Sequence, residues 1–192
     1  MQLTQAITLL GLSLYCLPVA TVMAAAPGEQ TFFVCTDYHC DRGWQVTLTA
    51  GQWQSIRNLF TGNTSPASER DSIRRAIARL ETLVGAITGT WRDLAGNIAG
   101  AGQPGQLDCI SESKNTTTYL QLLFNDGLLN WHDIEERQVR HTLIFNTHWT
   151  AAIRDRSSGM QFAVDSWFGD NGQPPIIQPL DDWESGRRTD EK

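Results

Sequence analysis

The sequence predicts an α+β fold, with helices packed on an antiparallel sheet. Two patterns indicate this class: apolar residues recur at helical spacing in the middle of the chain, and short strand-like segments with turn signals fill its carboxy-terminal part. Helices followed by strands, without regular alternation, are typical of α+β domains. A chain of 192 residues with 41% hydrophobic residues suits one domain with a buried core.

The charge of the chain argues against one broad class of function. It has 15 basic and 21 acidic residues, a formal net charge of −6, and no cluster of lysine or arginine that would form a basic stripe. A nucleic-acid binder needs such a face to displace counterions from phosphates. We therefore expect no nucleic-acid partner.

The amino terminus has the pattern of a cleaved secretory signal. An apolar run over residues 7–22 is followed by small residues up to Pro27, the order found in signal peptides. We expect residues 1–25 to be a signal peptide and residues 26–192 to form a single domain. That domain would be periplasmic or secreted, with no membrane contact after cleavage. An uncleaved anchor is the alternative, because about 20 apolar residues can span a bilayer.

Export changes how the cysteines are interpreted. Cys16 would leave with the signal, and Cys35 and Cys40 are close enough in sequence to close a short disulfide loop in an oxidising compartment. A zinc site that uses Cys35, His39 and Cys40 is the alternative, although it lacks a matching second half elsewhere. Cys109 is then left over, as a reactive thiol, an intermolecular partner or a buried apolar residue.

Two strands and a long helix open the predicted fold. Residues 31–35 and 45–49 read as strands, the second with the alternation of a half-buried strand. In the helix, Ser65 is the cap and Pro66 occupies the first turn. Its apolar stripe, which we expect to face the core, consists of Ile73, Ala76, Ile77, Leu80, Leu83, Val84 and Ile87. The arginines of the opposite face, expected in solvent, are Arg70, Arg74, Arg75 and Arg79.

A glycine-rich loop and a second helix follow. Residues 95–106 contain four glycines and Pro104, without the Gly-Lys-Ser/Thr ending of a phosphate-binding loop. The second helix is expected to begin near Cys109 and to stop near Asp126 and Gly127.

The rest of the chain is expected to form a sheet of short antiparallel strands. These strands cover residues 128–134, 140–145, 148–155 and 160–167, which are rich in β-branched and aromatic residues. A turn at residues 157–159 would join the last two as a hairpin. An irregular tail is expected after that, beginning at the two prolines 174–175 and returning Trp183 to the body.

One cysteine, one histidine and one aspartate form a candidate catalytic constellation. A thiol is a good nucleophile only as thiolate, and a helix amino terminus and a neighbouring imidazole both favour the thiolate. Cys109 stands at such a helix start. Residue pairs across the turn at 157–159 sum to about 313–315, which brings Asp165 close to His148. We therefore expect Asp165 to orient His148 as the base for Cys109.

Each of these residues also has an ordinary structural interpretation. Taken alone, a cysteine near a helix start is often buried as a small apolar residue, and a histidine that begins a strand is often structural. Asp165 could simply cap the turn that follows it. The three residues support a catalytic interpretation only in combination, with Cys109 left outside any disulfide.

The motifs Asp108-Cys109, His148-Trp149 and Val164-Asp165-Ser166 resemble those of the bacterial transglutaminase-like cysteine peptidases. The resemblance covers about residues 80–175 and implies a papain-like, transglutaminase-type core. It also implies that Cys109 is the nucleophile, His148 the general base and acid, and Asp165 the residue that orients His148.

For the oxyanion, the resemblance implies the backbone N–H of Cys109 and a second donor from Gln103 or Gln106. No cofactor is expected. Calcium stays open, because Asp108 and Glu112 flank Cys109 as acidic residues do in calcium-dependent members, although Ile110 interrupts the pattern.

The sequence thus favours a thiol hydrolase that cleaves peptide or isopeptide amide bonds through a thioester. Its partner would be a protein or peptide substrate. A non-catalytic periplasmic binding or assembly module with the same fold is the alternative. The sequence does not distinguish transfer to water from transfer to an amine, and it says nothing of oligomeric state.

Overall fold

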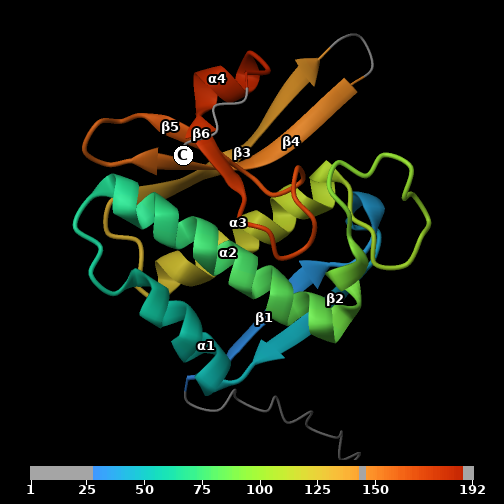
Figure 1. Cartoon of the computed structure of the whole chain (residues 1–192), viewed down its shortest axis with the longest axis horizontal. Helices are drawn as coiled ribbons and strands as arrows, with labels where there is room; N and C mark the ends of the chain where they lie inside the picture. The colour runs from blue at the N-terminus through green and yellow to red at the C-terminus, as the bar shows by residue number, and fades with distance from the viewer. Residues whose placement is uncertain (1–27, 143–145, 188–192) are drawn as a thin grey trace, which may run out of the picture.

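The computed structural model describes residues 28–142 and 146–187, and these form an α+β fold (Figure 1). The predicted signal peptide, residues 1–25, lies outside the described residues. Within them, no helix is long and apolar enough to cross a bilayer. The strands are β1 (Gln30–Cys35), β2 (Gly43–Leu48), β3 (His132–Thr142), β4 (Asn146–Asp155), β5 (Gln161–Asp165) and β6 (Ile176–Pro179). The helices are α1 (Ala50–Arg57), α2 (Pro66–Thr88), α3 (Cys109–Asn125) and α4 (Leu180–Glu184), with 3₁₀ turns η1 (Tyr38–Cys40), η2 (Asn58–Phe60) and η3 (Thr90–Arg92).

The strands form two separate antiparallel sheets. β1 and β2 make a two-stranded ribbon, and the other sheet has the order β3-β4-β5-β6. In Figure 1, α2 crosses the front of the molecule, with α3 behind it and the two sheets on opposite sides of these helices. One continuous apolar core joins both sheets to α2 and α3. The helix that begins with Cys109 is therefore held from two sides.

The amino-terminal elements confirm the two predicted strands and the disulfide between Cys35 and Cys40. The amide of Asn115 in α3 exchanges hydrogen bonds of 2.7 and 3.0 Å with the backbone of Cys35, which ties β1 to that helix. Thr49, predicted as the end of a strand, is instead the N-cap of α1, where it forms a capping box with Gln52. This helix was not expected from the sequence pattern.

Helix α2 confirms the predicted start at Ser65 and Pro66, and it ends at Gly89, whose φ of 88° suits a left-handed C-cap. The apolar stripe is buried up to Val84 except for Leu83, which is partly buried, and Ile87 in the last turn is 45% exposed. Here the prediction was wrong, because the core ends before the helix does.

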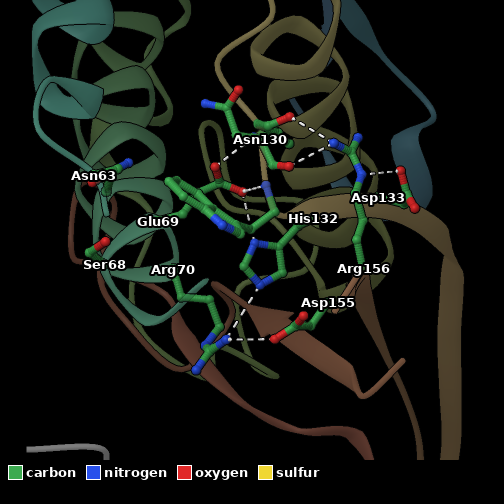
Figure 2. A network of polar contacts seen from close by, with 12 residues as sticks. Asn63, Ser68, Glu69, Arg70, Asn130, His132, Asp133, Asp155 and Arg156 are labelled. Atoms are coloured by element: carbon green, nitrogen blue, oxygen red, sulfur yellow. Dashed lines mark hydrogen bonds and ion pairs between the residues drawn. The ribbon is translucent and has the colours of Figure 1, made fainter. Parts of the chain in front are cut away.

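Arg70 also differs from the expectation of a solvated arginine face. Its side chain is 13% exposed and lies over the ring of Phe162, 4.2 Å from the centroid. Figure 2 shows its setting, a buried polar network between α2 and the strands. Glu69 bonds Nδ1 of His132 at 2.8 Å, and Arg70 contacts Nε2 of His132 at 3.4 Å and Asp155 at 3.9 Å. A buried arginine needs such partners, since leaving a charge unpaired in the interior is costly.

The four-stranded sheet departs from the prediction in two places. Residues 128–134 and 140–145 were expected as two strands, but β3 is a single strand with a bulge between Glu135 and Gln138. Polar residues continue this strand because Arg154 in β4 pairs across it with Glu135 at 2.6 Å. The tail after Pro175 is not irregular, since it forms β6 and α4 and buries Trp183 to 1% exposure.

Candidate active site

Cys109 is the first residue of α3, and the sequence fixes this helix start through Asp108. The Oδ1 atom of Asp108 accepts a hydrogen bond of 2.9 Å from the backbone N–H of Ser111, the usual role of an N-cap aspartate. Cys109 is half-buried and is the only free cysteine in residues 28–142 and 146–187. As the first helical residue, it has a backbone N–H without an intrahelical partner.

His148 and Asp165 meet across the β4–β5 pair. The observed register pairs Ala151 with Val164, a sum of 315, which lies within the predicted range. Asp165 directly follows Val164, and His148 lies three residues before Ala151; the Oδ2 atom of Asp165 lies 2.7 Å from Nε2 of His148, and both side chains are almost fully buried. The structure therefore brings the predicted histidine and aspartate into direct contact.

Aromatic rings enclose the imidazole of His148. The centroids of Trp167, Phe168 and Trp183 lie 4.8, 5.1 and 5.6 Å from that of the histidine. The indole N–H of Trp183 donates a bond of 2.7 Å to Oδ2 of Asp165, and the backbone N–H of Trp167 donates one of 3.3 Å to Oδ1. Both carboxylate oxygens of Asp165 are thus held in place, and so is the ring that Asp165 orients.

The electrostatics of this pocket favour the protonated ring. Burial by itself lowers the pKa of His148, but the hydrogen bond to Asp165 and the closeness of the Cys109 thiol outweigh it and raise the pKa to about 9. The other ring nitrogen, Nδ1, is buried and has no close hydrogen-bond partner. Since Asp165 occupies Nε2, Nδ1 is the nitrogen left to serve the thiol.

The thiol itself lies at the opening of this arrangement. Its sulfur is 3.9 Å from the backbone oxygen of Thr147, the residue before His148. Cys109 and His148 line the same cleft, and an imidazole oriented by a carboxylate next to a thiol can generate and stabilise a thiolate.

A cleft of about 340 Å³ opens onto Cys109. Its walls are formed by Tyr38, His39, Asn97, Ile98, Ala101, Asp108, Cys109, Thr147, His148 and Trp167. One wall comes from the disulfide loop and another from the glycine-rich loop after α2. These walls meet where the hydroxyl of Tyr38 donates to the backbone oxygen of Asn97. The cleft is large enough for a few side-chain or backbone groups of a substrate.

The disulfide loop is fastened to the start of α3. The Oδ2 atom of Asp108 accepts from the backbone N–H of His39 at 3.1 Å and lies 3.0 Å from its Nδ1. The hydroxyl of Ser111 accepts from the N–H of Cys40 at 2.9 Å. His39 and Cys40 have φ values of 57° and 61°, which side chains rarely adopt without such support. Tyr38 and His39 were not expected at the site; in the sequence, the short spacing of Cys35 and Cys40 was the only signal of a constrained loop there.

The two glutamines considered as oxyanion donors lie elsewhere in the glycine-rich loop. Gln106 is buried, and its side chain donates to the backbone oxygen of Arg92 and accepts from the amide of Asn97. Gln103 is exposed. Neither glutamine is among the residues that line the cleft.

In the part of the chain that the structure describes, no group of three or more His, Cys, Asp or Glu side chains is placed to hold a metal ion. The acidic residues considered for calcium have other contacts. Asp108 caps α3 and binds His39, while Glu112 is buried beside Asp93.

Comparison of the chain with protein-family models, with characterised proteins and with solved structures found no significant match.

Proposed function

We propose that this protein is a thiol hydrolase of the papain-like, transglutaminase type, which cleaves peptide or isopeptide amide bonds in the periplasm or outside the cell. The observation that carries the proposal is that His148 contacts Asp165 through Nε2 at 2.7 Å and lies beside Cys109. The arrangement has the order and roles of a nucleophile, a base and an orienting carboxylate. The disulfide between Cys35 and Cys40 supports an oxidising compartment.

The reaction follows from the contacts of His148. The ring takes the proton of the Cys109 thiol, and the thiolate attacks the carbonyl carbon of the substrate amide. The backbone N–H of Cys109 is free to stabilise the oxyanion that forms. His148 then gives its proton to the leaving amine as the C–N bond breaks, which leaves a thioester on Cys109.

Water completes the cycle. His148 accepts a proton from the attacking water, the C–S bond of the thioester breaks, and the carboxylic acid leaves while the thiol of Cys109 is restored. Asp165 accepts the hydrogen bond from Nε2–H throughout, so that the ring stays oriented and its positive charge is compensated.

The first test measures the chemistry of Cys109 directly. Folded protein should react with iodoacetamide at Cys109 at pH 6 faster than the same cysteine in urea-unfolded protein, because only the folded chain places His148 beside the thiol. Peptide mapping by mass spectrometry identifies the labelled cysteine. Cys109→Ala should lose this labelling and all hydrolysis of a peptide library.

Two further variants make the test specific. His148→Gln should lower both the alkylation rate and hydrolysis by about 10²-fold or more, the usual contribution of a general base. His141→Gln is the matched control, since His141 is exposed and does not line the cleft. Equal alkylation of folded and unfolded protein would show that the thiol is not activated, and a non-catalytic binding module would then be the better description.

A further inference from the structure

Three carboxyl groups are buried together next to the candidate site. They belong to Glu81 in α2, Asp93 directly after η3, and Glu112 in α3, and each is 5% exposed or less. Glu112 stands three residues after Cys109, in the first turn of the same helix. Nothing in the proposed mechanism uses these groups.

The cluster has no positive partner in residues 28–142 and 146–187, where no ion pair joins any of the three carboxyls to Arg, Lys or His. The groups that face it are acids and a phenol. Glu112 faces Glu81, Asp93 and Asp165. Asp170 faces Asp93, and Tyr119 faces both glutamates.

The cluster requires protons. The carboxyl groups of Asp93 and Glu112 are close enough to influence each other's pKa, and two neighbouring carboxyl groups buried without a cation are stable together only if at least one carries a proton. Oε1 of Glu81 is buried without a hydrogen-bond partner, where a full negative charge would be uncompensated.

Burial raises the pKa of all three carboxyl groups. It raises the pKa of Glu112 well above its usual value, and the neighbouring Glu81 and Asp93 add to that shift. Burial also raises the pKa of Glu81 to about 8 and that of Asp93 to about 6. At neutral pH the cluster therefore retains protons that carboxyl groups in solution have lost.

The same carboxyls hold the segment that leads into Cys109. Oδ1 of Asp93 accepts a bond of 2.8 Å from the backbone N–H of Leu107, two residues before Cys109. The carboxyl of Glu112, in the first turn of α3, lies close to that of Asp93. The start of α3 and the segment that leads into it therefore meet at this carboxyl pair.

The cluster also holds the segment that follows Asp165. Oε2 of Glu81 accepts a bond of 2.9 Å from the N–H of Gly172, and the backbone oxygen of Asp93 accepts one of 3.1 Å from Asn171. Ser166, the residue after Asp165, bonds Thr116 of α3 at 2.6 Å and lies within reach of Glu81. Both catalytic segments thus converge on the cluster.

We propose that Glu112 is a positioning residue of the thiol site, and that the proton it shares with Asp93 holds the start of α3 and the segment after Asp165 in register. The site is then assembled only at pH values at which the cluster keeps its protons. At higher pH, two or three buried negative charges would repel one another and separate the segments that they join. The statement that the cluster positions a catalytic site rests on the proposed function. The statement that the buried carboxyl groups keep protons does not depend on it.

The test uses Glu112→Gln, since glutamine has the shape of a protonated glutamate and cannot ionise. Urea unfolding of the full chain is measured from pH 5 to pH 8. Each extra proton bound by the folded state makes the folded-to-unfolded ratio fall about tenfold per pH unit. For each pH unit, we expect the folded-to-unfolded ratio of the wild type to fall by a factor about ten times larger than that of Glu112→Gln, which corresponds to one additional bound proton. The exposed Glu136→Gln is the matched control and should follow the wild type.

A second readout separates positioning from stability alone. Trp167 and Trp183 pack on His148, so the near-ultraviolet circular dichroism of their rings reports the arrangement of the site. Between pH 6 and pH 9 under folding conditions, the wild type should lose this signal and Glu112→Gln should keep it. If Glu112→Gln does not fold, Glu81→Gln tests the other end of the cluster by the same two measurements.

Equal slopes of wild type and variant would overturn the proposal, because Glu112 would then hold no additional proton. A difference in slope without any difference in the tryptophan signal would also overturn it, since the proton would stabilise the fold without positioning the site. Both measurements are repeated in Cys109→Ala. The expected differences should persist there even if no hydrolysis is ever found, so failure of the proposed function is distinguishable from failure of this inference.

Discussion

At the scale of single residues, the site depends on how Asp165 is held. Its Oδ2 atom accepts hydrogen bonds from Nε2 of His148 and from the indole N–H of Trp183, each at 2.7 Å. The guanidinium of Arg140 covers the outer face of that indole, 4.6 Å from the ring centroid. Trp183 therefore acts on the histidine through the carboxylate and is a positioning residue.

Trp183→Phe tests this contact. Phenylalanine lacks the N–H and part of the buried ring system, so the free energy of unfolding should fall by at least about 1.5–3 kcal/mol, the range for a hydrogen bond to a charged group. Urea unfolding measures this change, and the alkylation rate of Cys109 should fall with it. The exposed Trp44→Phe is the control, at 57% exposure. If both variants match the wild type, the indole N–H does not hold Asp165.

The sequence predicted that His148 and Asp165 lie close together and that Cys109 begins a helix, but it did not predict their surroundings. The hairpin register could be counted from the turn at 157–159, which placed the aspartate beside the histidine. The aromatic enclosure could not be counted, because Trp183 reaches Asp165 through β6 and α4, which the sequence did not predict.

At the scale of elements, the start of α3 joins secondary structure to the cleft. Asp108 caps the helix with one oxygen and binds His39 of the disulfide loop with the other. A single side chain therefore sets both the position of Cys109 and one wall of the cleft.

Two N-cap substitutions separate these roles. Asp108→Ala and Ser65→Ala should each lower the free energy of unfolding by about 1 kcal/mol, the usual cost of losing a cap. Only Asp108→Ala releases His39, so only this variant should also change the alkylation rate of Cys109. Thermal unfolding and iodoacetamide labelling provide the two measurements. If Ser65→Ala changes the alkylation rate equally, general destabilisation explains the effect.

The elements that sequence reasoning missed have physical reasons in common. α1 is a short helix whose sequence shows little apolar periodicity, and it packs through Trp53 and Ile56. The polar stretch of β3 is stable as a strand because Arg154 pairs with Asp133 and Glu135 across the ladder. In both cases distant partners decide the outcome.

At the scale of the whole molecule, shifted pKa values predict how stability depends on pH. The ring of His148 is buried, which opposes its charge, but Asp165 raises its pKa from 6.5 to about 9. The charged ring's contribution to the free energy of unfolding is fully present below pH 6.5 and is lost as the pH rises through 9.

Glu81 adds to this dependence, because burial raises its pKa to about 8. The folded state therefore binds this proton more tightly, and stability falls between pH 4.5 and 8.

Asp155 sets the acidic limit. Hydrogen bonds from Ser157 lower its pKa to about 2, so its contribution is present above pH 3.8 and lost as the pH falls toward 2. We expect the melting temperature to be highest between about pH 4 and 5 and to fall toward pH 9. Differential scanning calorimetry from pH 2 to 9 measures this profile. A flat melting temperature from pH 5 to pH 9 would contradict it.

By itself, the sequence determined the features that depend on near neighbours. These are the helix cap at Ser65, the disulfide between Cys35 and Cys40, the start of α3 at Cys109 and the register of the β4–β5 hairpin. Only the tertiary structure decided that Trp183 holds Asp165, that the disulfide loop lines the cleft, and that three carboxyls gather beside the site. The reason is that local spacing fixes the periodicity and caps of an element. Burial depends on segments that are distant in the chain and meet only when the chain folds. The pKa shifts that burial causes therefore depend on those segments as well.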